Sequence, residues 1–308
     1  MIESFWTEEQ MVRSNRIAAT AAMVALVLSS TAQRVSAQRM TRRLFVRVTD
    51  GSGQLVSGLT PADIRLTEGG VAREVTRVAA DVPMRVILLV DSTNAVAQNI
   101  TQFRSGLQAF YDGLPPALEV GFMTTGGQLK IRVPPGTDRQ KLRSEFQLFS
   151  AESGGNAIIE SLLEADTRFL KNAPDRWPVF VLVTNDTGAS RGEAPIDRYN
   201  RFMNDYLLRG GSAHAVVIGG TQTGIISDIV SNLVTNAGGI LETMTISNAL
   251  PDKMKALAAR LAADQTAMAG RYEIQYTSDA KAKPGAPIEL AVATRTDIRV
   301  SMSARRPF

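Results

Sequence analysis

The chain has 308 residues, 44% of them hydrophobic, with 34 basic against 30 acidic side chains. This length and apolar content are enough to fill a buried core. The net charge of +4 is spread along the chain, and no segment clusters basic with aromatic residues, so we expect no nucleic-acid partner. Cysteine is absent, which excludes disulfides, thiolate metal sites and cysteine nucleophiles.

The first forty residues have the order of an export signal. Arg13 and Arg16 precede an apolar run over residues 17–28. Residues 35–37 have the small or medium-sized side chains that signal peptidase requires before its cleavage site. The run has about 12 residues, whereas a membrane-spanning helix needs roughly 20. We therefore predict a signal peptide over residues 1–37 and a secreted, periplasmic or cell-envelope protein without a stable membrane anchor. An uncleaved anchor and a buried helix are the alternatives.

Short β segments are predicted on both sides of a longer central region. Alternating and apolar runs bounded by turn residues indicate strands at residues 44–48, 54–56 and 73–78, and again at 272–276, 288–292 and 298–300. We expect the C-terminal strands either to pair with the N-terminal ones or to extend the main sheet.

The central region alternates buried strands with helices. Continuous apolar runs predict strands at residues 86–90, 118–123, 179–183 and 213–218, and helical periodicity predicts helices at 100–111, 157–169, 198–208, 225–236 and 251–265. Residues 124–127 read as a hairpin turn into a strand at 129–133. This order specifies an α/β fold, a Rossmann-like doubly wound and mainly parallel sheet, with binding loops at the carboxyl ends of its strands.

The loop after the first central strand carries a motif. Asp91-Ser92-Thr93-Asn94-Ala95 resembles the metal-ion-dependent adhesion site of von Willebrand factor type A domains, in which Asp-x-Ser-x-Ser is joined by a later threonine and a later aspartate. The resemblance implies a ligand-binding domain in which Mg²⁺, held by oxygens from three loops, completes its shell with an acidic group of a protein partner.

The motif is degenerate in this chain. Asp91 matches the first aspartate and Thr93 keeps a hydroxyl, but Ala95 replaces the second serine. Asn156 stands at the position of the threonine and Asn185 at that of the second aspartate, with Asp186 one residue late. The loss of one oxygen and one charge weakens a Mg²⁺ site. Two interpretations remain: a weak metal site built from Asp91, Thr93, Asn156, Asn185 and Asp186, and a vestigial site that keeps only its loop structure.

The flanking segments extend the resemblance to about residues 43–308. Val48-Thr49-Asp50, residues 56–60 and Glu68-Gly69-Gly70 resemble the β preamble of von Willebrand-related proteins of acidobacterial-type genomes, and the tail is similar to their β extension. The resemblance implies a β preamble over residues 38–82, a type A domain over 83–249 and a C-terminal helix and β extension over 250–308.

No enzyme signature is apparent. His214 is the only histidine and lies within an apolar strand, and Ser92 lies in no Gly-x-Ser-x-Gly elbow. We therefore expect an exported protein of binding or adhesion type and not an enzyme. The alternatives are a structural component of a cell-envelope assembly and a hydrolase on a similar scaffold.

Overall fold

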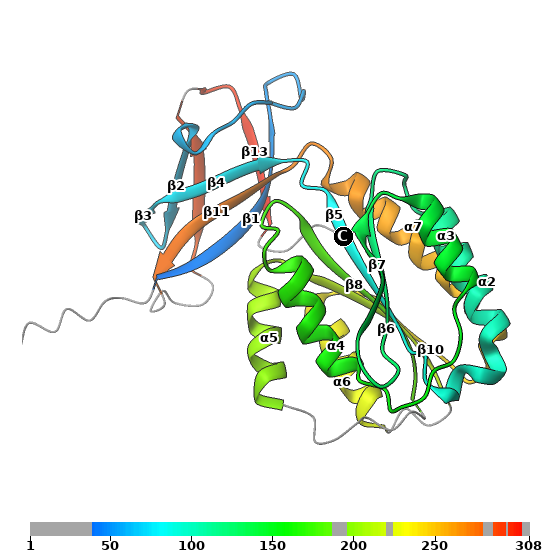
Figure 1. Ribbon diagram of the computed structural model, residues 1–308. Helices are drawn as coiled ribbons and strands as arrows, with labels where there is room; N and C mark the ends of the chain where they lie inside the picture. Colours follow the sequence, from blue (N-terminus) through cyan, green and yellow to red (C-terminus); the bar gives the residue numbers. More distant parts are fainter. Residues whose placement is uncertain (1–38, 187–195, 220–223, 280–285, 294, 304–308) are drawn as a thin grey trace, which may run out of the picture. The chain divides into compact units, whose positions relative to one another are not determined.

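The computed structural model describes residues 39–186, 196–219, 224–279, 286–293 and 295–303 (Figure 1). The predicted signal peptide lies outside these residues. Within them, no helix combines the length and the apolar character that a bilayer crossing requires.

A six-stranded sheet forms the α/β part. Its order is β10-β9-β8-β5-β6-β7, and every neighbouring pair is parallel except β6 and β7, which form an antiparallel hairpin. The strands are β5 (Met84–Val90), β6 (Glu119–Thr124), β7 (Lys130–Gly136), β8 (Trp177–Asn185), β9 (Ser212–Ile218) and β10 (Leu241–Met244). The predicted α/β class with a doubly wound, mainly parallel sheet is therefore confirmed.

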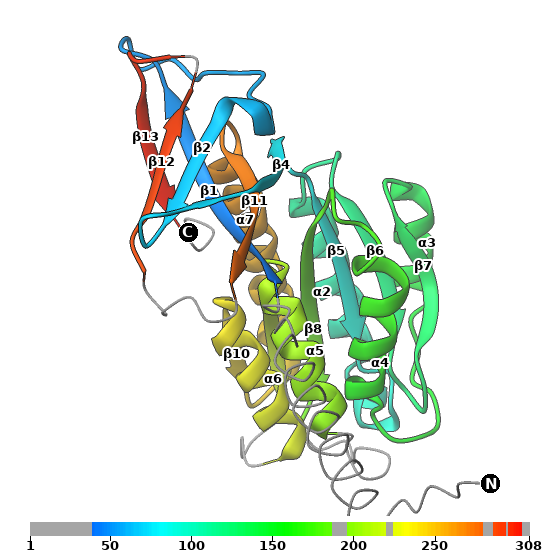
Figure 2. The same cartoon turned by 90° about the vertical axis from the view of Figure 1, so that its left-hand side faces the viewer.

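Helices cover both faces of this sheet because successive residues of each strand point to opposite sides. Val86, Leu88 and Val90 of β5 lie in one core cluster with residues of α2, α3 and α7, whereas Ile87 and Leu89 lie in a second cluster with α4, α5 and α6 (Figures 1 and 2). The helices are α2 (Ile100–Gly113), α3 (Arg139–Gln147), α4 (Ile158–Ala165), α5 (Ile196–Leu208), α6 (Ile225–Ala237) and α7 (Leu250–Met268). A single π-helical turn, η4 (Asp166–Leu170), continues α4, and short 3₁₀ turns lie at Pro61–Asp63, Asn94–Asn99 and Ser247–Ala249.

The flanking β segments pair with each other. One sheet has the order β13-β1-β11-β4 and a second has the order β12-β2-β3, and their inner faces share a core that includes Val46, Ile64 and Tyr276. The strands are β1 (Arg39–Thr49), β2 (Ile64–Glu68), β3 (Val71–Arg73), β4 (Val75–Ala80), β11 (Tyr272–Asp279), β12 (Ile288–Val292) and β13 (Arg299–Ser303). The C-terminal strands therefore pair with the N-terminal strands, which is the first of the two arrangements expected from the sequence.

Two local predictions need correction, and two elements are missing from the prediction. The predicted return strand at 54–56 is a single bridge between Thr49 and Leu55, with backbone hydrogen bonds from Asp50 N–H to Gln54 O at 2.9 Å and from Val56 N–H to Val48 O at 3.0 Å beside it. The helix predicted over 157–169 changes to π-helical geometry after Ala165. Finally, α3 and β10 were not predicted.

Candidate functional site

The candidate residues lie in loops at one edge of the parallel sheet. Asp91 follows β5, Asn185 ends β8 and Asn156 precedes α4. β5, β6 and β8 are parallel neighbours in one register, so their carboxyl ends meet at the same edge. The alternation of strands and helices therefore places the predicted residues at this one edge of the sheet, here called the loop edge.

Asp91 is the first hub of the loop edge. Its side chain is fully buried, and Oδ1 accepts a hydrogen bond of 2.8 Å from the backbone N–H of Thr93. Oδ2 accepts from the backbone N–H of Asn185 at 3.1 Å and from the side-chain amide of Asn185 at 3.4 Å. An aspartate that accepts a hydrogen bond from the N–H two residues further on forms a local turn, so this carboxylate both shapes its own loop and connects it to the end of β8.

Asn156 is the second hub. Its side-chain oxygen accepts from the hydroxyl of Thr125 at 2.7 Å, and its amide nitrogen donates to the hydroxyl of Thr184 at 2.8 Å. Backbone bonds of 2.8 Å from Gly127 N–H to Gly155 O and of 2.9 Å from Ala157 N–H to Thr125 O run beside it. Thr125 was not predicted as a site residue, although its position after β6 places it at the same edge.

A third connection uses Ser92, which stands at a variable position of the motif, and residues outside the motif. The hydroxyl of Ser92 donates to Glu152 at 3.0 Å and accepts from the backbone N–H of Gly126 at 3.0 Å. Glu152 also lies 3.1 Å from the ammonium of Lys130. Ser92 has no exposed surface, so its hydroxyl acts as a tie between loops and not as an accessible nucleophile.

Two side chains of the predicted set remain without partners among the described residues. They are the buried hydroxyl of Thr93 and both carboxylate oxygens of Asp186. Asp186 lies against Gly219 and Gly224, since a Cβ atom built on Gly224 would clash with its Oδ1. Hydrogen bonds thus join Asp91, Thr93 and Asn185, whereas no bond within the described residues joins Asp186 to them.

This arrangement does not fit a Mg²⁺ ion as it stands. Both oxygens of Asp91 already accept N–H donors, and Asn185 presents a nitrogen to Asp91 where a ligand oxygen would be needed. Ala95 offers no side-chain oxygen, and the described residues contain no cluster of three or more histidine or acidic side chains that could hold a metal. Mg²⁺ demands near-octahedral oxygen ligation, so no role for the ion follows from these contacts.

Comparisons with known proteins yield structural likenesses only. No known family model matches the chain, and no curated protein does. Among solved structures, a von Willebrand factor type A protein from Catenulispora acidiphila is 13% identical, with a TM-score of 0.49 over 74% of this chain and 51% of that one. BatB from Bacteroides thetaiotaomicron is 15% identical, with a TM-score of 0.46 over 58% of this chain and 99% of that one.

Proximal thread matrix protein 1 of the mussel byssus is 16% identical, with a TM-score of 0.49 over 60% of this chain and 49% of that one. The chain spans about half the length of this protein and of the Catenulispora protein. These likenesses concern the fold alone. The narrower resemblance to acidobacterial-type proteins stays a prediction.

Proposed function

We propose that the chain is a noncovalent binding protein of the von Willebrand type A kind, whose loop edge engages a protein partner. The observation that carries this proposal is the double hub of Asp91 and Asn156, which joins the loops after β5 and β6, the end of β8 and the loop before α4. Buried, mutually satisfied polar groups hold loops in one arrangement, and a preformed surface loses less entropy on binding.

Exposed residues around the hubs supply the contact surface. Asn94 and Ala95 after β5, and Ser153 and Gly154 before α4, are all exposed. The charged groups Lys130 and Glu152 lie beside them. The edge therefore offers polar and backbone groups for hydrogen bonds with a partner, and no chemical step is part of the proposal.

Binding at this edge is proposed to need no divalent ion, because three N–H donors from Thr93 and Asn185 already solvate the carboxylate of Asp91. Titration calorimetry of Mg²⁺ and Mn²⁺ into residues 38–308 tests this directly. We expect no saturable heat for this protein or for its Asp91→Ala variant. Saturable heat that Asp91→Ala abolishes would contradict metal independence and restore an ion-dependent site.

The partner surface is tested by site-specific photocrosslinking. A photoreactive residue at Asn94, on the loop edge, is expected to form a discrete crosslinked product with the partner protein. An excess of the same chain without the photoreactive residue should prevent this crosslink by competing for the partner. The matched control is Asn172, which is exposed in the loop that precedes β8, at the opposite edge of the sheet. The same product from both positions, or from neither, would count against the loop edge.

We also propose that the chain is exported, on the basis of the signal-peptide order of residues 1–37, and that the domain boundaries follow the predicted ranges. Cell fractionation with N-terminal sequencing of the mature protein tests the first point. A mature protein that begins near Gln38 supports export, whereas an intact N-terminus in the cytoplasmic fraction contradicts it.

A further inference from the structure

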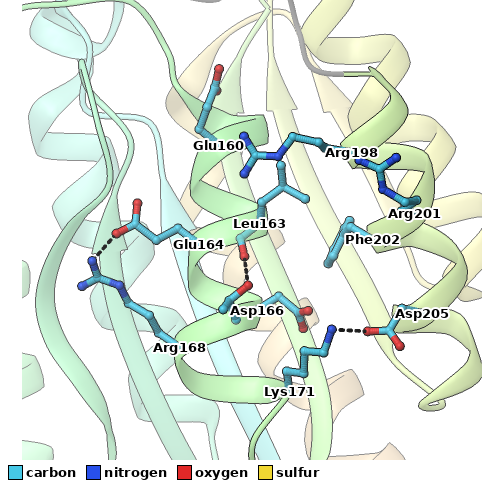
Figure 3. A pocket seen from close by; sticks show the side chains of 11 residues that line it. Glu160, Leu163, Glu164, Asp166, Arg168, Lys171, Arg198, Arg201, Phe202 and Asp205 are labelled. Carbon is cyan, nitrogen blue, oxygen red and sulfur yellow. Dashed lines mark hydrogen bonds and ion pairs between the residues drawn. The ribbon is translucent and has the colours of Figure 1, made fainter.

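A groove lies between the α4–η4 helix and α5, apart from the loop hubs (Figure 3). Its volume is about 790 Å³, which is within the range of about 300–1,000 Å³ typical of ligand sites. Leu163 and the largely buried ring of Phe202 form its apolar floor, and its other lining side chains are mostly charged.

Most of these charges are neutralised within the protein. Arg168 pairs with Glu164 at 2.5 Å, and Lys171 lies 3.6 Å from Asp205. The buried carboxylate of Asp166 accepts two hydrogen bonds, of 2.7 and 2.8 Å, from a single guanidinium nitrogen of Arg209. This half of the groove therefore has no unmatched charge to offer a ligand.

The other half differs because two arginines lack a counterion. Neither Arg198 nor Arg201 has a carboxylate within 4.0 Å among the described residues, and both are exposed. They are three residues apart on α5, so they lie on the same side of the helix. Arg198 extends from α5 toward α4 beneath Glu160, and the guanidinium of Arg201 lies on the same side of the groove as the start of the Arg198 side chain (Figure 3).

The position of these arginines on the helix adds to the surplus of positive charge. α5 begins at Ile196, so Arg198 lies in its first turn and Arg201 in its second. A helix N-terminus carries partial positive charge and favours anions, and cations there are unfavourable. Asp197 offsets this in part. A bound anion would offset it further, and a guanidinium group binds a carboxylate through two parallel N–H donors.

We propose that this groove binds an acidic peptide segment of a partner protein, with separate carboxylates of the segment bound by Arg198 and by Arg201. From Glu160 to Lys171 the wall runs about 16 Å at a helical rise of about 1.5 Å per residue, which matches about five residues of extended chain. Leu163 and Phe202 pack against the aliphatic parts of the segment. Glu160 disfavours a compact dianion such as phosphate more than it disfavours single, separated carboxylates.

The test is fluorescence anisotropy with a labelled hexaglutamate peptide, with hexaglutamine as the uncharged probe and inorganic phosphate as a competitor. We expect saturable binding of hexaglutamate that weakens with salt, and at least tenfold weaker binding to the double variant Arg198→Gln/Arg201→Gln. The matched control, Arg65→Gln/Lys255→Gln, removes the same charge from exposed positions on β2 and α7 and is expected to change the affinity less than about twofold. Glu160→Gln is expected to tighten binding.

The outcomes separate this groove from the loop edge. Asp91→Ala, which disrupts the hubs, is expected to leave hexaglutamate binding intact, so each proposal can fail without the other. Equal losses of hexaglutamate affinity in the two double variants would mean that only the net charge of the protein matters, and would overturn the proposal. Binding of phosphate with the same arginine dependence, but none of hexaglutamate, would assign the groove to small anions and also overturn it.

Discussion

At the scale of single residues, the side-chain nitrogen of Asn185 determines whether the loop edge is organised by a hydrogen bond to Asp91 or needs a metal ion. An aspartate at this position would place a second carboxylate 3.4 Å from Asp91 without a counterion. We predict that Asn185→Asp destabilises the protein by about 3 kcal/mol without metal, because it replaces a donor to a buried carboxylate with a like charge. Added Mn²⁺ or Mg²⁺ should recover much of this loss, since two carboxylates compensate the desolvation of the ion better than one.

Thermal unfolding with and without Mn²⁺ measures this effect, with Asn172→Asp at an exposed position as the control. An ion-dependent rise in Tm for Asn185→Asp alone is the expected pattern. If Asn185→Asp is as stable as the parent protein without metal, the amide bond to Asp91 does not organise the edge.

The residues of this edge were predictable and their contacts were not. Asp91, Thr93, Asn156 and Asn185 were identified from the resemblance to the adhesion-site motif, and the alternation of strands and helices predicted that their loops meet at one end of the sheet. The orientation of a side-chain amide cannot be predicted in this way, because it depends on which donors and acceptors surround the amide in the folded protein. Only the three-dimensional arrangement shows Asn185 donating to Asp91, and the carboxylate of Asp186 lying against two glycines.

At the scale of elements, the three strands β1, β11 and β4 are joined by a buried ion cluster. Glu273 on the central strand β11 lies 2.6 Å from Arg43 on β1 and 3.3 Å from Arg77 on β4, and its side chain is fully buried. Burial lowers the pKa of Arg43, and the charge of Glu273 opposes that shift. We predict that Glu273→Gln costs about 3–5 kcal/mol, because it leaves Arg43 without its counterion.

Urea denaturation measures this cost, and Glu289→Gln on the exposed face of β12 serves as the control, with an expected change below about 0.5 kcal/mol. Similar denaturation midpoints for both variants would mean that the cluster does not hold the sheet together.

The elements that sequence patterns missed are those with little apolar signal. In α3 only Leu142 and Phe146 are buried, so its helical period is carried by two residues and by the side chain of Asp138, which accepts from the N–H of Lys141. β10 has four residues, none fully buried, because it is an edge strand with a single partner. The apolar central strands β5, β8 and β9 were predicted because burial on both faces leaves an unbroken hydrophobic run.

The connection from α6 to β10 contains two adjacent glycines, one needed for its backbone conformation and the other for lack of space for a side chain. Gly238 ends α6 with a φ of 71° and open space around it, whereas a Cβ atom on Gly239 would overlap the carbonyl oxygen of Ala213 on β9. We predict that Gly238→Ala costs about 1 kcal/mol from backbone conformation. Gly239→Ala should cost about 3 kcal/mol or more, because β10 must move away from β9. Equal costs in urea denaturation would contradict the close approach.

At the scale of the whole molecule, a buried histidine contributes to the pH dependence of stability. His214 is the only histidine of the chain, is 2% exposed on β9, and accepts a hydrogen bond at Nδ1 from the N–H of Ile240. Burial lowers its pKa from 6.5 to about 4, with a smaller contribution from the charge of Arg260. The folded protein therefore keeps this side chain neutral over a range in which the unfolded chain binds a proton.

The sign of the effect follows from proton binding. Between pH 6.5 and about 4 the unfolded state binds more protons at His214, so stability is fully present above pH 6.5 and falls as the pH decreases, by up to about 3 kcal/mol. Asp166 and Asp264 act in the opposite direction, because burial raises the pKa of each in the folded state. The observed slope is therefore a net slope, and His214 must be isolated by substitution.

We predict that His214→Asn flattens the dependence of the unfolding free energy on pH between 6.5 and 4. The variant itself is destabilised at pH 8, since Asn fills less volume in the core. The comparison therefore concerns the slope and not the absolute value. Urea denaturation of both proteins across this pH range measures it. The same slope in the two proteins would mean that His214 is protonated in the folded state and that the carboxylates alone govern acid unfolding.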